Sequence, residues 1–282
     1  MTVSNQILPS ALGPTLDSSS FARTPASAQA GVLIINADDW GRDRETTDRI
    51  LECALHGSVS SASAMVFMED SERAADLARQ HGVDVGLHLN LTTPFSAPGQ
   101  PEALFDHHAR VSGFLKRNPL CKVFYHPGLT GSFEYLVEAQ LEEFVRIFGE
   151  APRRVDGHHH MHLCANVLFG GLLPAGTIAR RNFSFQPGEK SGMNRAYRRF
   201  IDGVLAKRHR LTDFFFSLPP LEPAQRLERI FAAAATSVVE LETHPINPEE
   251  HRFLTQGGVH RFTENLAIAP RFTLSASASQ IQ

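Results

Sequence analysis

The sequence predicts an α/β protein: a deformed or incomplete parallel β/α barrel of about seven strands, in a single domain. From Gly31 onward, short apolar runs alternate with amphipathic stretches, and such repeated strand–helix units favour a parallel sheet with right-handed crossovers. Residues 32–35 are four consecutive aliphatics, which is typical of a strand buried on both faces. The length of 282 residues fits one domain of this kind.

The expected elements follow one another along residues 30–274. Strands are expected at residues 32–35, 59–67, 85–92, 155–163, 178–185, 213–218 and 237–244, where apolar or alternating runs occur. Helices are expected at residues 46–56, 71–81, 133–148, 194–207 and 223–235, and glycines follow the first three. Residues 93–133 are too long for a plain loop, so they are expected to form an insertion or lid near the substrate.

Composition narrows the class of protein. A net charge of −3 without a basic stripe argues against nucleic-acid binding. The three cysteines are odd in number and lack CxxC spacing, which argues against a disulfide framework or a cysteine-based zinc site. Residues 1–29 are expected to be a disordered leader and residues 275–282 a disordered tail. No stretch approaches ~20 apolar residues, so no membrane span is expected, and a cytoplasmic location is the expectation. Homo-oligomerisation stays open.

A histidine-rich run, Val155–Leu163, is the most distinctive motif. It places four of the fourteen histidines within residues 158–162. If the run is extended, Asp156, His158, His160 and His162 share one face. Neutral imidazole is the commonest ligand for catalytic transition metals, so the pattern predicts a metal-dependent site. A polar loop that happens to be rich in histidine is the alternative.

Two other expected strands carry polar side chains that could meet this row. Asp38 and Asp39 follow the buried run 32–35 after Asn36 and Ala37, at a strand end where active-site residues of α/β folds collect. An Asx-rich turn that caps the next helix is the alternative. His88 and Asn90 lie on the polar face of the alternating run 85–92, where a hydrogen-bonded structural histidine is the alternative.

The last expected strand ends in His244-Pro245. Glu240, Glu242 and His244 share one face of this strand, although His244 could instead begin a turn. All these strand-like runs could bring their polar residues to one end of a barrel.

Four motifs in the same order resemble the YdjC-like carbohydrate deacetylase family, which includes chito-oligosaccharide deacetylases and hopanoid-biosynthesis relatives. The motifs are Asn36-Ala37-Asp38-Asp39-Trp40-Gly41, Gly86-Leu87-His88-Leu89-Asn90-Leu91-Thr92, Asp156-Gly157-His158-His159-His160-Met161-His162 and His244-Pro245. They span about residues 31–270. Trp40 stands where the commoner family motif has phenylalanine. The resemblance provides no motif within the stretches 93–133 and 174–236.

The resemblance implies a role for each polar residue of these motifs. One divalent metal ion would be held by Asp39, His88 and His158, with Asp38 as general base and His244 as general acid. His160, His162 and Asn90 would contact the substrate or support the ligands. The family implies Mg²⁺, whereas two imidazoles and a carboxylate suit Zn²⁺ or another transition metal.

The expected function is therefore a metal-dependent hydrolase that removes N-acetyl groups from an amino sugar or oligosaccharide. Three protein ligands would leave room for a water on the metal, which attacks the amide while Asp38 takes its proton. One alternative is another metal-dependent barrel hydrolase, a phosphoesterase or amidohydrolase, which a two-metal site would favour. Another is a non-catalytic metal-binding protein, against which the presence of Asp38 and His244 speaks.

Overall fold

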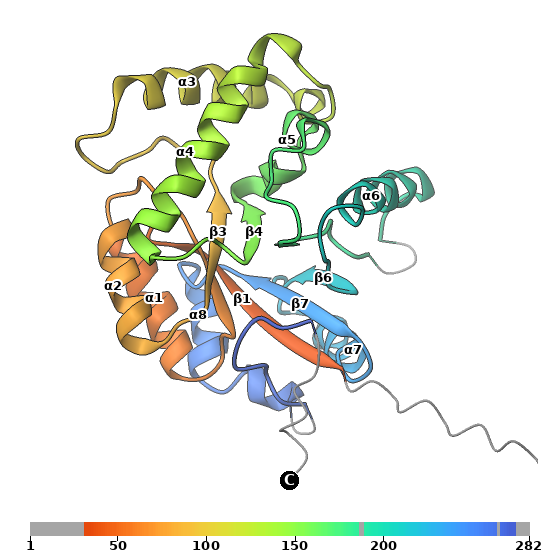
Figure 1. Cartoon of the computed structure of the whole chain (residues 1–282). Helices are drawn as coiled ribbons and strands as arrows, with labels where there is room; N and C mark the ends of the chain where they lie inside the picture. Colours follow the sequence, from red (N-terminus) through yellow and green to blue (C-terminus); the bar gives the residue numbers. More distant parts are fainter. Residues whose placement is uncertain (1–30, 186–188, 264–265, 275–282) are drawn as a thin grey trace, which may run out of the picture.

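A seven-stranded parallel sheet forms the centre of the computed structural model, which describes residues 31–185, 189–263 and 266–274 (Figure 1). The strand order is β5-β4-β3-β2-β1-β7-β6. The strands are β1 Val32–Trp40, β2 Ser61–Ala64, β3 Val85–Leu89, β4 Arg154–Gly157, β5 Ile178–Ala179, β6 Phe214–Ser217 and β7 Val238–Thr243. The expected leader 1–29 and tail 275–282 lie outside the described residues.

Helices lie between most successive strands, and α8 follows the last strand. They are α1 Arg44–Leu55, α2 Ser71–His81, α3 Glu102–Arg117, α4 Thr130–Phe148, α5 Ala165–Gly170, α6 Gly192–Leu205, α7 Ala224–Ala233 and α8 Pro248–Thr255. Local chemistry fixes their ends: the Asp43 side chain accepts a 2.8 Å hydrogen bond from Thr46 N and caps α1, and Gly82 ends α2 in the left-handed region. None of the helices among the described residues is long and apolar enough to cross a membrane.

The chain between β5 and β6 brings the two edges of the sheet together. Ala179 N donates to Arg210 O at 3.0 Å, and Ser184 N donates to Phe215 O at 2.7 Å. These contacts join segments next to opposite edge strands, so the sheet is curled around an interior. The expectation of a deformed parallel barrel of seven strands in one domain is confirmed.

Strand β1 anchors the interior. All nine of its residues are buried, and Trp40 at its end donates a 3.1 Å hydrogen bond from Nε1 to Ala74 O in α2. A buried tryptophan needs such a partner for its N–H group. The end of β1 is thereby fixed against α2, immediately after the two aspartates.

The prediction of a strand at residues 155–163 is wrong beyond Gly157. There the chain turns into the 3₁₀ segment η3, His158–Leu163, and both His159 and His160 adopt positive φ, at 54° and 57°. The turn folds back closely, because a Cβ on Gly157 would lie 2.8 Å from His162 N. The alternation of side chains between two faces ends with the strand.

Other elements differ in length. The expected strands at 59–67 and 178–185 shorten to β2 and β5, and α8 adds a helix that the periodicity missed. The insertion at 93–133 contains α3, followed by the 3₁₀ segments η1 Pro119–Lys122 and η2 Pro127–Leu129. Helix α3 packs against α4 at the top of Figure 1. A role for this insertion as a lid stays a prediction.

Candidate metal centre

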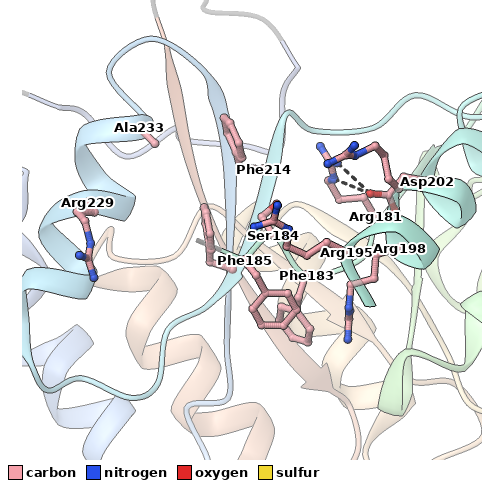
Figure 2. A pocket seen from close by; sticks show the side chains of 12 residues that line it. Arg181, Phe183, Ser184, Phe185, Arg195, Arg198, Asp202, Phe214, Arg229 and Ala233 are labelled. Atoms are coloured by element: carbon pink, nitrogen blue, oxygen red, sulfur yellow. Dashed lines mark hydrogen bonds and ion pairs between the residues drawn. The ribbon is translucent and has the colours of Figure 1, made fainter. Parts of the chain in front are cut away.

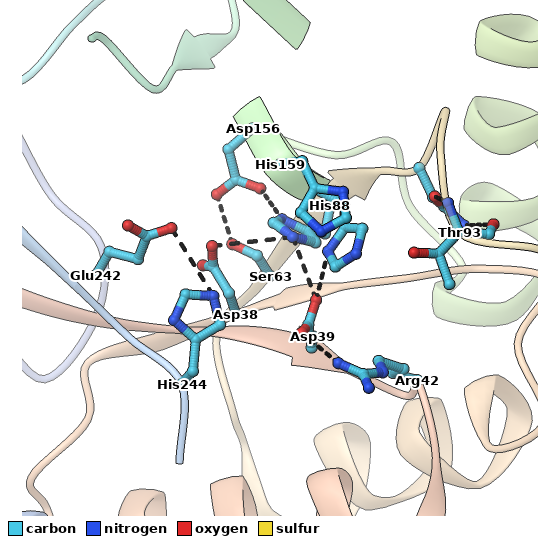
Figure 3. Close-up of polar contacts among 12 residues, drawn as sticks. Asp38, Asp39, Arg42, Ser63, His88, Thr93, Asp156, His159, Glu242 and His244 are labelled. Carbon is cyan, nitrogen blue, oxygen red and sulfur yellow. Dashed lines mark hydrogen bonds and ion pairs between the residues drawn. The ribbon is translucent and has the colours of Figure 1, made fainter. Parts of the chain in front are cut away.

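Three side chains from separate parts of the chain converge at the carboxyl ends of the central strands. Figure 3 shows two of them, Asp39 and His88, facing each other. Asp39 comes from β1, His88 from β3 and His158 from the start of η3. Asp39 Oδ1 lies 2.9 Å from His158 Nδ1 and 3.4 Å from His88 Nε2. One potential ligand atom from each of the three lies within 4.8 Å of the other two, and all three residues are buried.

An irregularity at the end of β1 directs Asp39 into this site. The pairing of β1 with β2 shifts register between Ala37 and Trp40, and Asp39 has a φ of 74°. Aspartate is one of the few residues that adopt this left-handed conformation with some frequency. The shift allows the two adjacent aspartates to make different contacts. Asp39 Oδ2 also accepts a 3.0 Å hydrogen bond from Arg42 Nη1.

Asp156 orients His88. Strands β3 and β4 pair His88 with Asp156, and His88 Nδ1 lies 2.7 Å from Asp156 Oδ1. Ser63 Oγ donates a 2.6 Å hydrogen bond to the other carboxylate oxygen. The contact at Nδ1 leaves His88 Nε2 facing Asp39, an arrangement typical of a metal-binding histidine.

The donor set fits a divalent cation. Asp39 Oδ1 is buried and receives no hydrogen bond of acceptable geometry from the described residues, although two imidazole nitrogens face it. Burial alone would raise the pKa of Asp39, but His158 and His88 outweigh it and hold the pKa well below its usual range. Burial lowers the pKa of His88, yet Asp38 and Asp156 raise it to about 10. A cation would compete with that proton at Nε2.

Arg180 holds Asp38 by two parallel contacts. Its Nη1 lies 2.6 Å from Asp38 Oδ2, and its Nη2 lies 2.7 Å from Asp38 Oδ1; both side chains are almost completely buried. Burial would raise the pKa of Asp38, but the adjacent Arg180 and His88 hold it well below the usual range. Asp38 is therefore ionised and fixed in orientation.

Arg180 also contacts three further carboxylates. Its Nε lies 2.7 Å from Glu240 Oε1, its Nη2 lies 3.0 Å from Asp156 Oδ2, and its Nη1 lies 3.5 Å from Glu242 Oε1. The sequence analysis missed this residue. The expected strand 178–185 placed Arg180 in its interior, whereas Arg180 follows β5 directly, at the edge of the sheet where the ends of parallel strands meet.

His244 and Glu242 lie on the other side of Asp38. His244 Nε2 is 4.0 Å from Glu242 Oε1, and the His244 side chain keeps 36% of its surface exposed. Its backbone N–H donates to Glu250 Oε2 at 2.9 Å, which fixes the start of the turn. Burial and the nearby Asp38 charge raise the pKa of Glu242 well above its usual range.

The remaining residues of the histidine row lie in three different environments. His160 Nε2 is 3.8 Å from Glu242 Oε1, and burial keeps the pKa of His160 well below its usual value. His162 points into the core, where its Nε2 lies 2.9 Å from Arg180 O and burial lowers its pKa to about 4. His159 was not singled out by the motif analysis, but its ring packs 4.0 Å from that of His158.

Asn90 builds the turn after β3. Its side-chain oxygen accepts from the backbone N–H groups of Thr92 and Thr93, and its amide donates to Thr93 O at 2.7 Å. Thr92 Oγ1 in turn lies 2.9 Å from His159 Nδ1. Asn90 thus supports the site through its neighbours.

Two further groups of potential ligands share Asp38: one with His88 and Asp156, and one with Glu242 and His244. Both oxygens of Asp38 are already in contact with Arg180. A guanidinium beside Asp38 repels a second cation there. The geometry therefore favours one cation, at Asp39, over a two-metal site.

Comparisons with known proteins agree with this fold. A family model described as YdjC-like protein matches residues 32–267. The chain is 35% identical over 133 residues to a chitooligosaccharide deacetylase of Serratia marcescens, covering 47% of this chain and 51% of that protein. It is 34% identical over 145 residues to a carbohydrate deacetylase of Mus musculus, covering 48% of this chain and 44% of that protein. The chain spans about half the length of the curated relatives it matches.

A solved structure extends the likeness to nearly the whole fold. The crystal structure of an Enterococcus faecalis V583 protein assigned to cellobiose-phosphate cleavage superposes with a TM-score of 0.60 at 20% identity, covering 85% of this chain and 96% of that one. The family model covers the barrel strands and all four sequence motifs. This chain belongs to the YdjC-like family.

Proposed function

We propose that this chain is a carbohydrate deacetylase, a hydrolase that removes N-acetyl groups from an acetylated amino sugar or oligosaccharide with the help of one divalent cation. Membership of the YdjC-like family and the curated names of its relatives support the reaction class. The observation that carries the proposal is the buried oxygen of Asp39, which faces two imidazoles beside an ionised Asp38.

Asp39 Oδ1, His88 Nε2 and His158 Nδ1 would hold the cation. When bound, a divalent cation polarises the amide carbonyl and makes the attacking water more acidic. Two imidazoles favour Zn²⁺ or another transition metal, whereas the family resemblance favours Mg²⁺.

Asp38 would act as the general base. Arg180 keeps it ionised at neutral pH and fixes its direction, so that it can accept a proton from the attacking water. His244 would be the general acid, because its ring lies near Asp38 at the half-exposed edge of the site. It would donate its proton to the departing amine. Glu242, whose raised pKa favours the protonated form, lies between His244 and His160.

The insertion at residues 93–133 would cover the substrate. Thr93, its first residue, is hydrogen-bonded to Asn90 at the end of β3. Thr92, directly before the insertion, also contacts the histidine row, because its Oγ1 lies 2.9 Å from His159 Nδ1.

Release of acetate tests the proposed function. The protein, loaded in turn with Zn²⁺ and Mg²⁺, is incubated with N-acetylated mono- and oligosaccharides, with and without a chelator. We expect acetate from at least one sugar, loss of this activity with the chelator, and recovery when the cation returns. Tight cation binding without turnover on any acetylated sugar would instead support a non-catalytic metal-binding protein.

A further inference from the structure

A groove lined by arginine and phenylalanine side chains runs beside β6 (Figure 2). It consists of two adjoining cavities of about 510 and 480 Å³, which share the lining residues Phe183, Ser184, Phe185 and Phe216. Each cavity is large enough for a small organic ligand. We call this feature the arginine groove.

The arginine groove is strongly positive although the chain as a whole has a net charge of −3. Five arginines line its larger cavity, namely Arg181, Arg195, Arg198, Arg199 and Arg229. Among the described residues that line this cavity, Asp202 is the one carboxylate, and it pairs with Arg181 at 2.9 Å. The other four arginines lie outside ion-pair distance of Asp202. The adjoining cavity adds Arg226, Lys190 and one further carboxylate, Glu189, so positive side chains outnumber negative ones in both cavities.

The arginines lie on two opposite walls of the arginine groove. Figure 2 shows Arg195 and Arg198 on α6, with Arg229 across the groove on α7. Arg198 donates to two uncharged oxygens, from Nε to Asn194 Oδ1 at 2.8 Å and from Nη1 to Asn182 Oδ1 at 3.5 Å. Burial lowers the pKa of Arg198, and the nearby Asp202 charge offsets this only in part. An anion between the walls would supply the missing partner.

Phenylalanine rings form the floor between the walls. Phe214 and Phe216 lie nearly parallel with centroids 6.1 Å apart, and the Arg198 guanidinium lies 4.8 Å from the centre of the Phe185 ring. Phe214 retains 38% of its surface exposed. Such a surface accepts a flat or apolar group next to the anion.

One aromatic ring joins the arginine groove to the metal centre. Phe183 lines both cavities, and its centroid lies 4.7 Å from that of His160. His160 in turn approaches Glu242 at 3.8 Å. Phe183 also stacks at 4.5 Å on Phe215, whose ring lies under the Arg180 guanidinium. A molecule that extends past Phe183 could occupy both places at once.

We propose that the arginine groove binds the phosphate of a substrate in which the acetylated amino sugar is joined, through that phosphate, to a flat or apolar group. The inference rests on the proposed deacetylase function. A phosphate fits because its several oxygens can accept hydrogen bonds from guanidinium groups on both walls, and arginine pairs with phosphate in two-point contacts. The phenylalanine floor receives the group beyond the phosphate.

Turnover of matched substrates tests the proposal. UDP-N-acetylglucosamine carries the sugar, a diphosphate and a flat ring, and is compared with the neutral sugar N,N′-diacetylchitobiose. We expect a higher kcat/KM for the sugar nucleotide. In the double variant Arg195→Gln/Arg229→Gln, we expect the ratio of the two kcat/KM values to fall by about tenfold or more, because the variant removes a charged hydrogen-bond donor from each wall of the groove.

Arg153→Gln is the matched control, because it also removes a positive charge. Its side chain is 83% exposed and pairs with Glu150, so both rates should match those of the unaltered protein. Thermal unfolding checks that all variants are folded. A ratio that stays unchanged in the double variant, or a preference for the neutral sugar, overturns the proposal.

A binding measurement separates this inference from the proposed function. Calorimetric titration with UDP, in the presence of chelator, needs no turnover. Binding that weakens in the double variant but not in Arg153→Gln supports the phosphate site even if no sugar is deacetylated. Turnover of neutral sugars without UDP binding leaves the deacetylase function intact and overturns the inference. Binding to vesicles of anionic lipid that requires the same arginines, with no gain for the sugar nucleotide, also overturns it.

Discussion

Asp38 and Arg180, 142 positions apart in the sequence, meet through two nearly equal contacts of 2.6 and 2.7 Å inside the barrel. Both contacts use charged groups, and both side chains are about 1% exposed. A guanidinium that faces both oxygens of a carboxylate fixes its orientation as well as its charge. The proposed base is thus held by a residue outside the four sequence motifs.

Replacing Arg180 by lysine should alter the pH dependence of the reaction. Lysine keeps the positive charge but not the paired contacts, so the pKa of Asp38 should rise from its depressed value. Protonation of Asp38 would then begin at higher pH, and the acid limb of the kcat/KM profile should move upward. We expect kcat to fall by about 10²-fold from misplacement of the base. An unchanged profile, relative to Arg79→Lys on the surface of α2, would contradict this role.

Removal of either histidine should release the cation. His88→Ala and His158→Ala each delete one of three proposed ligands, so bound metal after dialysis should drop from one ion per chain to a small fraction of that. Elemental analysis by mass spectrometry measures it. The control is His56→Ala at the end of α1, whose side chain is 51% exposed. Full occupancy in both variants would show that the ligands lie elsewhere.

The two adjacent aspartates should behave differently when each is replaced by asparagine. Asp38→Asn should retain the cation yet lose turnover by about 10²–10⁴-fold, the usual effect of losing a general base. Asp39→Asn should lose the cation as well. His244→Ala should retain the cation and lose most activity on substrates whose amine leaves poorly. The reverse pattern for the two aspartates would mean that their roles are exchanged.

Glu242→Gln should stabilise the cation-free protein at neutral and alkaline pH. Burial and Asp38 raise the pKa of Glu242, so the folded state holds its proton more tightly than the unfolded state does. Folding stability linked to this group is present at low pH and is lost as the pH rises through the folded pKa. Glutamine resembles the protonated form and avoids that loss. Thermal unfolding at several pH values should show a gain in Tm that shrinks toward acid, and a constant difference would contradict this assignment.

The sequence predicts those elements whose local signals agree with the tertiary fold. The expected helix at 71–81 coincides with α2, because its apolar spacing and its terminal Gly82 specify both its buried face and its end. Strand β1 was longer than its four aliphatics indicated, because Asn36, Asp38 and Asp39 are buried polar residues that find partners or face the site. Polar strand ends of this kind look like turns in a sequence.

The histidine row shows why the alternation of residues along the sequence does not predict the geometry of the site. Alternation places His158 and His162 on one face, but the backbone reverses at His159 and His160, and His162 turns into the core. Nothing in a single sequence signals two consecutive non-glycine residues with positive φ. Arg180 was missed for a related reason, since its partners come from β1, β4 and β7 and only the folded sheet brings them together.

The proposed ligand role of Asp39 depends on a backbone conformation that is unfavourable for folding. An aspartate with a φ of 74° costs the chain about 1–3 kcal/mol for its backbone conformation. Glycine at this position would relieve the backbone cost but would remove the carboxylate that His88, His158 and Arg42 face. One substitution at this position would therefore remove the proposed ligand set without touching the apolar core around β1, so a folded barrel of this kind is not by itself evidence of a bound cation.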